Sequence, residues 1–568
     1  MRYHVLATDY DGTLAHHERV SQETIESLKS LKASGRKLIL VTGRELDELK
    51  ALFPEYNLFD RIVAENGALI YRPGTLEERL LGDAPPPEFV AYLRERNISP
   101  LSVGRVIVAT WEPNQFTVLE AIQKLGIEKQ VIFNKGAVMV LPAGINKEKG
   151  LSEAVCELGY SMHNVVAVGD AENDTAMMAA TECSVAVSNA LESVKTLCDF
   201  TTKEDHGRGV SELIENIIEN DLADKESLLS RHHIQIGTSA DNEPFMLSPY
   251  SRGVLLAGTS GGGKSTLTSA FIENLAAKNY QFCLIDPEGD YLDMQGPIQL
   301  GSSSQVPELE QIVKVLDNTS QSCVICTLAI PLEDRPAFFL KLLNTLLDMR
   351  KNYGHPHWFI FDEAHHLIPK EASATYFNMP AHFTRFFAIT TKPELINETL
   401  VKEVDTIVAL GKDAEKTIQS FAEIRNINFH YDQSHNLPQG EALVWNADTS
   451  SAPVLIKSSV PLKVMQRHRK KYATGDMGPD SFYFKGPEGK LNLKAFNLNT
   501  FVQLSKGVDD ETWLFHLRNK DYSKWFKEFV NDDELSRLTE HIEESESDVT
   551  KSREAISKLV EERYTAPA

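Results

Sequence analysis

The eight residues ATDYDGTL, at positions 7 to 14, decide the fold of the first part of this chain. They end an apolar run, YHVLATD, that is typical of a buried strand, and they place Asp9 and Asp11 two positions apart where that strand stops. Gly12 follows and can take the turn that brings the backbone back over a site. In such a pair, one carboxylate can act as a nucleophile while the other transfers a proton. The sequence therefore predicts a carboxylate active site at the end of the first strand.

The surrounding residues, 1 to about 218, alternate short apolar runs with helix-like segments, which indicates a parallel α/β sheet. Ligand sites of such sheets lie at the carboxyl ends of the strands. We expect four more polar groups at this edge, because a hydroxyl and an ammonium group suit phosphoryl oxygens and carboxylates suit Mg²⁺. These groups are Thr42 in LILVTGR, Lys147 in GINKEKGL, and Asp170 with Asp174 in VAVGDAENDTAMM.

The combined set resembles the haloacid dehalogenase (HAD) phosphatase superfamily, and ENGALI, GINKEKGL and GDAENDTAMM are similar to its Cof-type branch, which contains many sugar-phosphate phosphatases. The resemblance implies a Rossmann-like parallel sheet with an inserted α+β cap at about 82 to 145. It also implies that Asp9 is the nucleophile that becomes an aspartyl-phosphate, and that Asp11 is the acid/base. By the same resemblance, the phosphoryl group is held by Thr42 and Lys147, and Mg²⁺ by Asp9, the Asp11 carbonyl, Asp170 and Asp174.

Three further residues are substrate candidates by this resemblance. Arg44 and Asn66 are placed on the cap side, and Asn173 supports the metal site. For Arg44, a salt bridge at the start of a helix is an equally good interpretation. The cap is shorter than in many relatives, which leaves the identity of the substrate open.

A second α/β pattern opens with a phosphate-binding loop. Residues 258 to 265, GTSGGGKS, fit G-x-x-x-x-G-K-[ST] between a strand, GVLLA, and a helix-like segment. The backbone N–H groups of such a loop point at phosphate oxygens, the lysine reaches the β and γ phosphates, and the serine can bind Mg²⁺. We therefore expect ATP to be bound by Gly258, Ser260, Gly261, Gly262, Gly263, Lys264, Ser265 and Thr266.

A later stretch, HWFIFDEAHHLIP (357 to 369), adds two carboxylates after an apolar strand. Asp362 can hold the water shell of Mg²⁺ and Glu363 can polarise the attacking water, which favours ATP hydrolysis over phosphoryl transfer to another substrate. The strand RFFAITTKP ends in Thr390 and Thr391, where a sensor of the γ-phosphate would lie, although a hydroxyl that caps the next helix fits equally well. His365 and His366 are interpreted as packing or hydrogen-bonding residues.

Residues 233 to 458 resemble the HerA/FtsK group of P-loop ATPases in LIDPEGDY, the DEAH strand, AITTKPELINETLVKEVDTIVAL and GEALVW. The resemblance implies a RecA/HerA-like α/β domain, a homo-oligomer such as a hexameric ring, and an arginine from a neighbour, for which Arg350 and Arg385 are candidates. Many members move DNA. Two departures limit this inference: Thr stands where Gln is frequent at the end of the fourth strand, and an upstream barrel is not evident.

Composition sets the outer limits of these interpretations. The chain has 568 residues with 58 basic and 81 acidic side chains, a net charge of −23, which argues against a surface that coats nucleic acid or an anionic membrane. Six scattered cysteines fit a reducing compartment, and Cys323 and Cys326 fit a buried strand better than a zinc site. No apolar run is long enough to span a membrane, so we expect a cytoplasmic protein.

The length divides into four predicted parts: a phosphatase at 1–218, a linker at 219–232, an ATPase at 233–460 and a mixed, mostly helical region at 461–568. In the last part, the basic run 463–471 beside Tyr472 fits an exposed helical face better than a phosphate contact, and the aromatic residues of 510–529 fit the core of a small helical domain.

The sequence thus predicts a Mg²⁺-dependent phosphatase for a small phosphate monoester, fused to a domain that hydrolyses ATP. One alternative is an end-processing enzyme that removes a 3′-phosphate from nucleic acid and phosphorylates a 5′-hydroxyl. Another is a HerA-type DNA motor or defence ring with a phosphatase effector.

Overall fold

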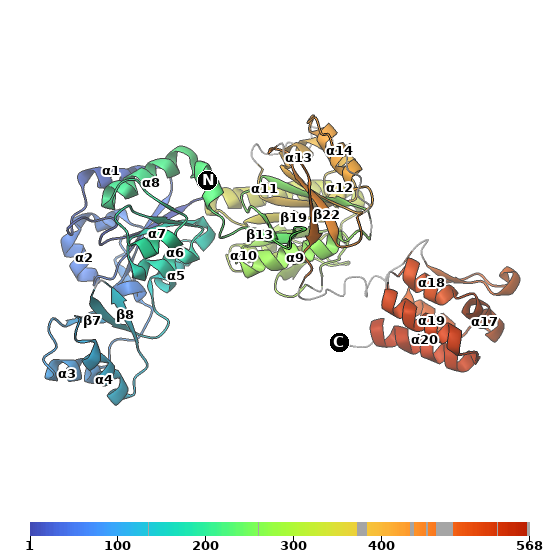
Figure 1. Cartoon of the computed structure of the whole chain (residues 1–568), viewed down its shortest axis with the longest axis horizontal. Coiled ribbons are helices and arrows are strands. Elements are labelled where there is room, and N and C mark those ends of the chain that lie inside the picture. The colour runs from blue at the N-terminus through green and yellow to red at the C-terminus, as the bar shows by residue number, and fades with distance from the viewer. Residues whose placement is uncertain are drawn as a thin grey trace. The chain divides into compact units, whose positions relative to one another are not determined.

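The structure is a computed structural model that describes residues 1–134, 136–259, 261–292, 294–371, 383–431, 437–449, 452–461, 477, 481–530 and 532–564. The chain forms two compact units. The first contains Met1–Gly289 and Gly296–Leu462, and the second contains Asp290–Gln295 and Lys463–Ala568. Figure 1 shows the elements of both.

The amino-terminal part is built on an eight-stranded sheet in the order β12-β11-β10-β1-β2-β3-β4-β5. Pairing is parallel from β12 to β3, and β4 and β5 are added antiparallel at one edge. The bounds are β1 Val5–Asp9, β2 Lys37–Val41, β3 Arg61–Ala64, β4 Leu69–Arg72, β5 Glu77–Leu80, β10 Val165–Gly169, β11 Cys183–Ala186 and β12 Phe200–Thr201. The predicted Rossmann-like α/β fold is confirmed.

The central strands of this sheet are buried on both faces, which explains why they are continuous apolar runs rather than alternating ones. Helices α1 and α8 pack on each other, and α5 packs beside α6. Ser21 caps α1 by accepting a hydrogen bond from the Thr24 backbone. The helices are α1 Gln22–Ala33, α2 Leu46–Leu52, α5 Lys147–Glu157, α6 Thr175–Ala180, α7 Glu192–Leu197 and α8 His206–Asn220.

An α+β module is inserted between β5 and α5. Its four-stranded antiparallel sheet has the order β6-β7-β9-β8. One face packs on two helices through Phe89, Leu93 and Val118, while Met139 lies on the other face near Gly43, in the loop that follows β2. The bounds are α3 Pro87–Glu95, β6 Ser102–Val103, β7 Val108–Trp111, α4 Gln115–Leu125, β8 Gln130–Asn134 and β9 Ala137–Leu141.

The next part is an eleven-stranded sheet in the order β14-β13-β23-β22-β21-β15-β20-β19-β16-β18-β17. Strands β21 to β17 along this order are parallel, and the other four are antiparallel. Cys323 and Cys326 lie on the fully buried β18, as predicted. The strands are β13 Ile234–Thr238, β14 Pro244–Leu247, β15 Gly253–Gly258, β16 Phe282–Asp286, β17 Ile298–Leu300, β18 Cys323–Cys326, β19 Trp358–Phe361, β20 Phe386–Thr390, β21 Thr406–Leu410, β22 Glu441–Asn446 and β23 Val454–Ser458.

The helices of this second sheet include the one that follows the glycine-rich loop, α9. Gly354, in the left-handed region, ends the longest of them, α11. The bounds are α9 Lys264–Ala277, α10 Leu309–Leu316, α11 Arg335–Tyr353, α12 Ala364–Leu367, α13 Glu398–Glu403 and α14 Ala414–Ile424.

Within the first unit, hydrogen bonds join the domain that contains the eight-stranded sheet to the domain that contains the eleven-stranded sheet. They connect residues that precede β10 with residues that precede β16 or β19, which places the contacts at the amino ends of the strands on both sides. These hydrogen bonds pair His163 with Lys278, Asn164 with Gly354, and Gly159 with His355.

The second unit is a small helical domain with a two-stranded sheet. Trp513, Tyr522, Trp525 and Phe526 are buried in its core, which confirms the packing role predicted for the aromatic residues. Residues 463–471 and Tyr472 lie outside the described residues. The elements are β24 Phe482–Phe484, β25 Leu493–Ala495, α16 Leu498–Ser505, α17 Asp510–Arg518, α18 Asp521–Glu528, α19 Asp533–Ser545 and α20 Val549–Tyr564.

No helix in the described part of the chain combines the length and the apolar character needed to cross a membrane.

Candidate functional site

The carboxylates predicted from the sequence converge at the carboxyl ends of β1 and β10. Asp9 ends β1, and Asp170 follows β10 directly. Oxygen atoms of Asp9, Asp170 and Asp174 lie within 4.8 Å of one another, and all three residues are buried. Such a set of carboxylate oxygens is the kind that hard cations such as Mg²⁺ prefer. The residues present therefore fit the predicted ion.

Lys147, the first residue of α5, reaches into this cluster. Its Nζ donates to Asp9 Oδ1 at 2.5 Å and to Asp174 Oδ1 at 2.6 Å. The lysine is buried, and Asn146 caps its helix by accepting a hydrogen bond from the Lys149 backbone. The buried ammonium group is thus fixed between two carboxylates by the start of a helix.

The turn after β1 brings the backbone against the same cluster. Gly12 has a φ of 88°, and a Cβ atom at this position would collide with the Asp170 carboxylate. Thr13 donates from its hydroxyl to Asp170 Oδ1 at 3.2 Å. Glycine is therefore required here both for the turn and for the space beside Asp170.

Buried charge sets the electrostatics of the cluster. Burial and the neighbouring Asp174 raise the pKa of Asp9 well above its ordinary value, although Lys147 acts against this. Burial lowers the pKa of Lys147, but Asp174 and Asp9 outweigh it and leave that pKa raised. The ammonium group is accordingly charged at neutral pH and can attract the negatively charged oxygens of a phosphoryl group.

Thr42 lies one position beyond β2 and is fully buried. Its backbone N–H donates to Val63 O at 2.8 Å, and its Oγ1 accepts from the Arg44 backbone at 3.1 Å. These contacts fix the hydroxyl at the carboxyl edge of the sheet, the edge that also carries Asp9.

Arg44 binds the predicted acid/base. Its Nε and Nη2 donate to the two oxygens of Asp11, each at 2.8 Å. Its Nη1 also pairs with Glu48 of α2 at 2.5 Å, so the salt bridge at a helix start is present. The guanidinium group thus holds a catalytic candidate, a role that sequence spacing does not reveal because Asp11 and Arg44 are 33 positions apart.

Asn66 and Asn173 meet beside the cluster. Asn173 Nδ2 donates to Asn66 Oδ1 at 3.1 Å. The remaining amide atoms, Asn66 Nδ2 and Asn173 Oδ1, are buried and have no hydrogen-bond partner among the described residues. One donor and one acceptor are therefore available to a ligand at this point.

The glycine-rich loop lies at the carboxyl end of β15, with Lys264 and Ser265 opening α9 and Thr266 in its first turn. Lys264 Nζ donates to Gly258 O at 2.8 Å and to Thr259 O at 3.3 Å. Gly261 and Gly263 adopt φ values of 78° and 97°, which glycine tolerates, and Gly262 stands between them. Ser260 lies outside the described residues.

Asp362 and Glu363 follow β19 at the same edge. The Glu363 backbone N–H donates to Asp362 Oδ1 at 3.0 Å. His365 Nδ1 lies 3.4 Å from Glu363 Oε2 and 3.3 Å from Thr390 Oγ1, so this histidine connects the predicted catalytic glutamate with the end of β20. Burial lowers the pKa of His365 to about 4, with further contributions from His366 and Lys264, so the ring is neutral at physiological pH. The hydrogen-bonding interpretation of His365 is confirmed.

The two candidate arginines lie at the amino ends of the strands of this sheet, opposite to the carboxyl ends that carry the glycine-rich loop and Asp362. Arg350 donates to the backbone carbonyls of Pro356, Thr384 and His357. Arg385 directly precedes β20 and so lies at its amino end, whereas the glycine-rich loop lies at a carboxyl end. Both therefore lie at the end of the sheet opposite to the nucleotide site of their own chain, and three N–H groups of Arg350 donate to carbonyls of its own domain.

Comparison with known proteins matches both parts of the chain. A family model described as haloacid dehalogenase-like hydrolase, Hydrolase_3, matches residues 6–110 and 112–214, and one described as the central domain of the helicase HerA matches residues 234–366. A phosphoglycolate phosphatase of Methanothermobacter thermautotrophicus is 30% identical over 219 residues, which is 37% of this chain and 96% of that protein. Phosphoglycolate phosphatase 2 of Saccharolobus solfataricus is 30% identical over 229 residues, 38% of this chain and 92% of that protein.

Proposed function

We propose, from the premise that this chain belongs to the haloacid dehalogenase-like hydrolase family, that its amino-terminal domain is a Mg²⁺-dependent phosphatase for small phosphate monoesters. The observation that carries the proposal is the buried ammonium group of Lys147 between Asp9 and Asp174, with Asp170 beside them. This arrangement supplies a nucleophile, a fixed positive charge and an oxygen-rich cation site at one strand end.

In the proposed reaction, an oxygen of Asp9 attacks phosphorus and the bond from phosphorus to the ester oxygen breaks. Asp11 donates its proton to the departing alkoxide, and Asp9 then carries the phosphoryl group as an acyl phosphate. Asp11, now a carboxylate, takes a proton from the water that attacks phosphorus, which releases phosphate and restores Asp9. Lys147 and the Thr42 hydroxyl hold the phosphoryl oxygens throughout.

The proposed Mg²⁺ would be held by Asp9, the Asp11 carbonyl, Asp170 and Asp174. When bound, it supplies charge neutralisation for the phosphoryl oxygens. Asn66 Nδ2 and Asn173 Oδ1 are proposed to contact the rest of the substrate, because both atoms are buried beside the cluster without a partner in the described chain. The substrate class is a sugar phosphate or another small phosphometabolite. The names of the two relatives add phosphoglycolate to the candidates.

We further propose that residues 233–460 bind and hydrolyse ATP. The supporting geometry is the glycine-rich loop at the carboxyl end of β15, with Asp362 and Glu363 at the carboxyl end of β19, from which β15 is separated by β20 alone. Glu363 is placed as the residue that activates water, and Asp362 and Ser265 as those that hold Mg²⁺ with its water shell. Assembly into a homo-oligomeric ring, action on DNA and a cytoplasmic location are expectations from the HerA resemblance and the composition.

Three variants test the two-site proposal in the full chain: Asp9→Asn, Lys264→Ala and Glu363→Gln. Phosphate release is measured from p-nitrophenyl phosphate and, separately, from ATP, with the exposed Asp83→Asn as a matched control. Asp9→Asn is expected to abolish only monoester hydrolysis, and the other two only ATP hydrolysis. Monoester hydrolysis that persists in Asp9→Asn would refute the nucleophile assignment. A phosphometabolite screen that includes phosphoglycolate then identifies the substrate.

A further inference from the structure

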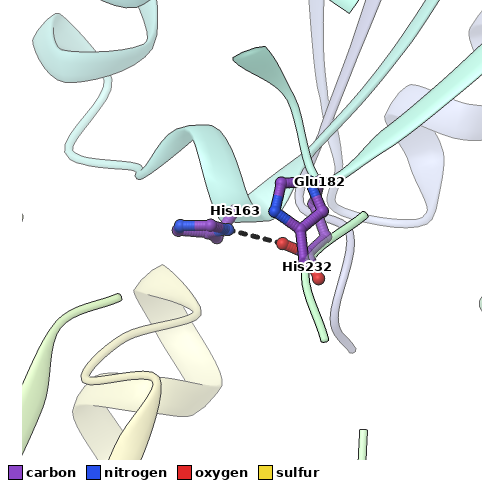
Figure 2. A group of neighbouring side chains, drawn as sticks. All are labelled: His163, Glu182 and His232. Carbon is purple, nitrogen blue, oxygen red and sulfur yellow. Dashed lines mark hydrogen bonds and ion pairs between the residues drawn. The ribbon is translucent and has the colours of Figure 1, made fainter. Parts of the chain in front are cut away.

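A second cluster of potential metal ligands lies at the amino ends of strands in the phosphatase sheet, whereas Asp9 and Asp170 lie at the carboxyl ends. His163 precedes β10, Glu182 precedes β11, and His232 lies between α8 and β13, in the segment that connects the two domains. One atom of each side chain lies within 4.8 Å of the others, and His163 and Glu182 are buried. Figure 2 shows the contact between His163 and the Glu182 carboxylate, with His232 next to Glu182.

We propose that His163, Glu182 and His232 bind one zinc ion, which links the segment between the two domains to the amino ends of β10 and β11 in the phosphatase sheet.

The first argument comes from the hydrogen bonds of His163. Its Nε2 lies 2.8 Å from Lys278 O, and because a carbonyl oxygen only accepts hydrogen bonds, Nε2 carries a proton. Its Nδ1 lies 2.5 Å from Glu182 Oε2. In the neutral ring, Nδ1 presents a lone pair to the carboxylate, so a cation must lie between the two atoms. At 2.5 Å that cation is a proton, because a zinc ion lies about 2.0 to 2.2 Å from each of its nitrogen and oxygen ligands. A metal ion would replace this proton, with the two side chains farther apart.

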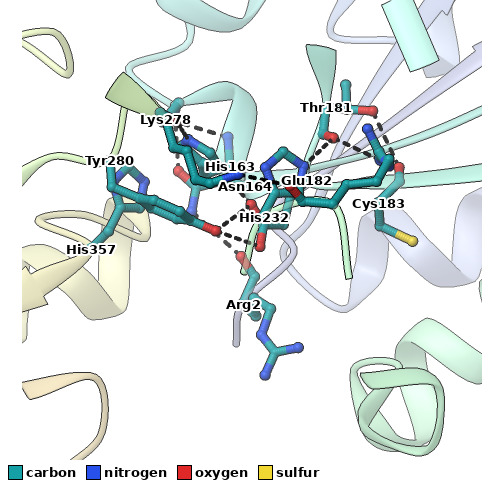
Figure 3. A network of polar contacts seen from close by, with 12 residues as sticks. Arg2, His163, Asn164, Thr181, Glu182, Cys183, His232, Lys278, Tyr280 and His357 are labelled. Carbon is teal, nitrogen blue, oxygen red and sulfur yellow. Dashed lines mark hydrogen bonds and ion pairs between the residues drawn. The ribbon is translucent and has the colours of Figure 1, made fainter. Parts of the chain in front are cut away.

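His232 repeats the arrangement. Its Nε2 lies 3.1 Å from Thr181 O, another group that only accepts, so this nitrogen also carries a proton. Figure 3 shows the ring of His232 between Thr181 and Glu182. A single shared proton satisfies His163 and Glu182 but leaves the Nδ1 lone pair of His232 unused, whereas a metal ion uses a lone pair from each of the three side chains.

The outer contacts are those that orient metal ligands. Metal-binding histidines commonly donate their second N–H to a backbone carbonyl, and metal-binding carboxylates are themselves hydrogen-bonded. Both histidines do so here, and the Tyr280 hydroxyl lies 3.0 Å from each oxygen of Glu182. The Tyr280 ring also stacks on His163, with ring centroids 3.8 Å apart. The three ligands are therefore held from both domains.

The ligand types select the metal. Two imidazoles and one carboxylate suit zinc, which completes a four-coordinate site with one further ligand. Mg²⁺ prefers oxygen ligands alone, as offered by Asp9, Asp170 and Asp174. The two clusters also lie at opposite strand ends, because His163 and Glu182 precede the strands that Asp170 and its neighbours follow. The two sites therefore differ both in ligand type and in location, so zinc bound at one can be distinguished from Mg²⁺ bound at the other.

The test loads the purified full chain with zinc, removes unbound metal in a buffer with excess Mg²⁺, and measures zinc by mass spectrometry. One zinc per chain is expected in the wild type and in Asp170→Asn, which reports on the oxygen-ligand site. His232→Ala should lower zinc affinity at least tenfold, while the adjacent His233→Ala should retain it. Monoester hydrolysis should persist in His232→Ala, since this residue lies outside the catalytic cluster.

Cobalt substitution gives a second readout on the wild-type chain, which stands even if His232→Ala or Glu182→Gln fails to fold. Bound Co²⁺ should show visible absorption of a site with nitrogen and oxygen ligands. Less than a tenth of an equivalent of zinc on the wild type, undiminished zinc in a folded His232→Ala protein, or a thiolate charge-transfer band that places the ion on cysteine would each overturn the proposal.

Discussion

The contact between Arg44 and Asp11 shows how one residue can fix the orientation of another at the carboxyl ends of the strands. Asp11 is the more exposed of the two proposed catalytic aspartates, with 44% of its side chain accessible, so its carboxylate has room to rotate. Two parallel hydrogen bonds from one guanidinium group restrict that rotation, since a bidentate pair fixes direction as well as distance. We infer that Arg44 positions the proposed acid/base rather than the substrate.

Replacing Arg44 with lysine tests this inference. Lysine keeps the charge but offers a single point of contact, so Asp11 loses its fixed orientation. We expect kcat for p-nitrophenyl phosphate to fall about 10- to 100-fold, which is at most the lower limit of a general acid's usual contribution because Asp11 itself remains, while KM changes less than about twofold.

Glu48→Gln is the matched control, because it removes another partner of Arg44 without touching Asp11. It should leave kcat within about twofold of the wild type. A rise in KM of tenfold or more in Arg44→Lys, with kcat preserved, would instead show that Arg44 contacts the substrate.

The candidate site could be predicted from the sequence where a residue's role depends on its place at a strand end. Asp9, Thr42, Asp170 and the glycine-rich loop were found in this way, because parallel strands bring their carboxyl ends to one edge. The partnership of Arg44 with Asp11 depends on two loops and on rotamers, which sequence spacing does not encode. The cluster around Glu182 was not predicted, because its ligands precede strands and one comes from the connector.

At the scale of elements, Glu157 ties the end of α5 to the antiparallel edge of the first sheet. It accepts hydrogen bonds from Arg61 on β3, Arg72 on β4 and Arg79 on β5. Partial burial raises the pKa of Glu157, but Arg72, Arg79 and Arg61 outweigh it and lower this pKa to about 2. Because α5 begins at Lys147, this anchor also supports the residue that reaches the catalytic cluster.

We expect Glu157→Gln to lower the free energy of unfolding of the phosphatase part by about 2 kcal/mol at pH 7, because three guanidinium groups lose a charged acceptor. A carboxylate whose pKa is lower in the folded state stabilises above its unfolded pKa and loses that effect as pH falls toward 2. The difference between variant and wild type should therefore shrink below about pH 4.

Thermal unfolding from pH 7 to pH 3 measures this difference. Glu153→Gln serves as the control, since Glu153 contacts Arg79 and Lys149 but neither Arg61 nor Arg72. An effect of Glu157→Gln no larger than that of Glu153→Gln would contradict the proposed anchor.

The buried strands of both sheets could be predicted because each is a continuous apolar run, as in β1, β10 and β19. The edge strand β5 could not, since its residues EERL are all exposed and carry no apolar pattern. Its position follows from pairing with β4 and from the ion pairs of Arg79, which are properties of the folded chain.

At the scale of the whole molecule, histidines gather where the phosphatase and ATPase domains meet. His4 is 3% exposed, and burial, together with the charged amino terminus, lowers its pKa to about 4. Asp221 acts in the other direction, while Arg385 and Arg36 reinforce the lowering. The same direction holds for His355 and His357, whose pKa values are also lowered by burial.

These shifts predict an acid-sensitive junction. A histidine whose folded pKa lies below its unfolded pKa favours the unfolded state once the pH falls below about 6.5, because the unfolded chain takes up the proton first. For His4, the loss of stability at pH 5 relative to pH 7.5 should be about 2 kcal/mol.

The prediction is checked by comparing Tm at pH 7.5 and pH 5 for the wild type, His4→Gln and the exposed control His17→Gln. The decrease should be smaller in His4→Gln than in the other two proteins. Equal decreases in all three would show that His4 does not titrate in this way.

The contacts at the amino ends of the strands, between the phosphatase and ATPase domains, determine which way the two proposed active sites open. The hydrogen bonds from His163, Asn164 and His355 use the ends of strands opposite to those that carry Asp9 and the glycine-rich loop. Each catalytic edge therefore opens away from these contacts. Within one chain these contacts therefore offer no direct path for a molecule from one edge to the other. Any communication between the two sites along these contacts must pass through the protein itself.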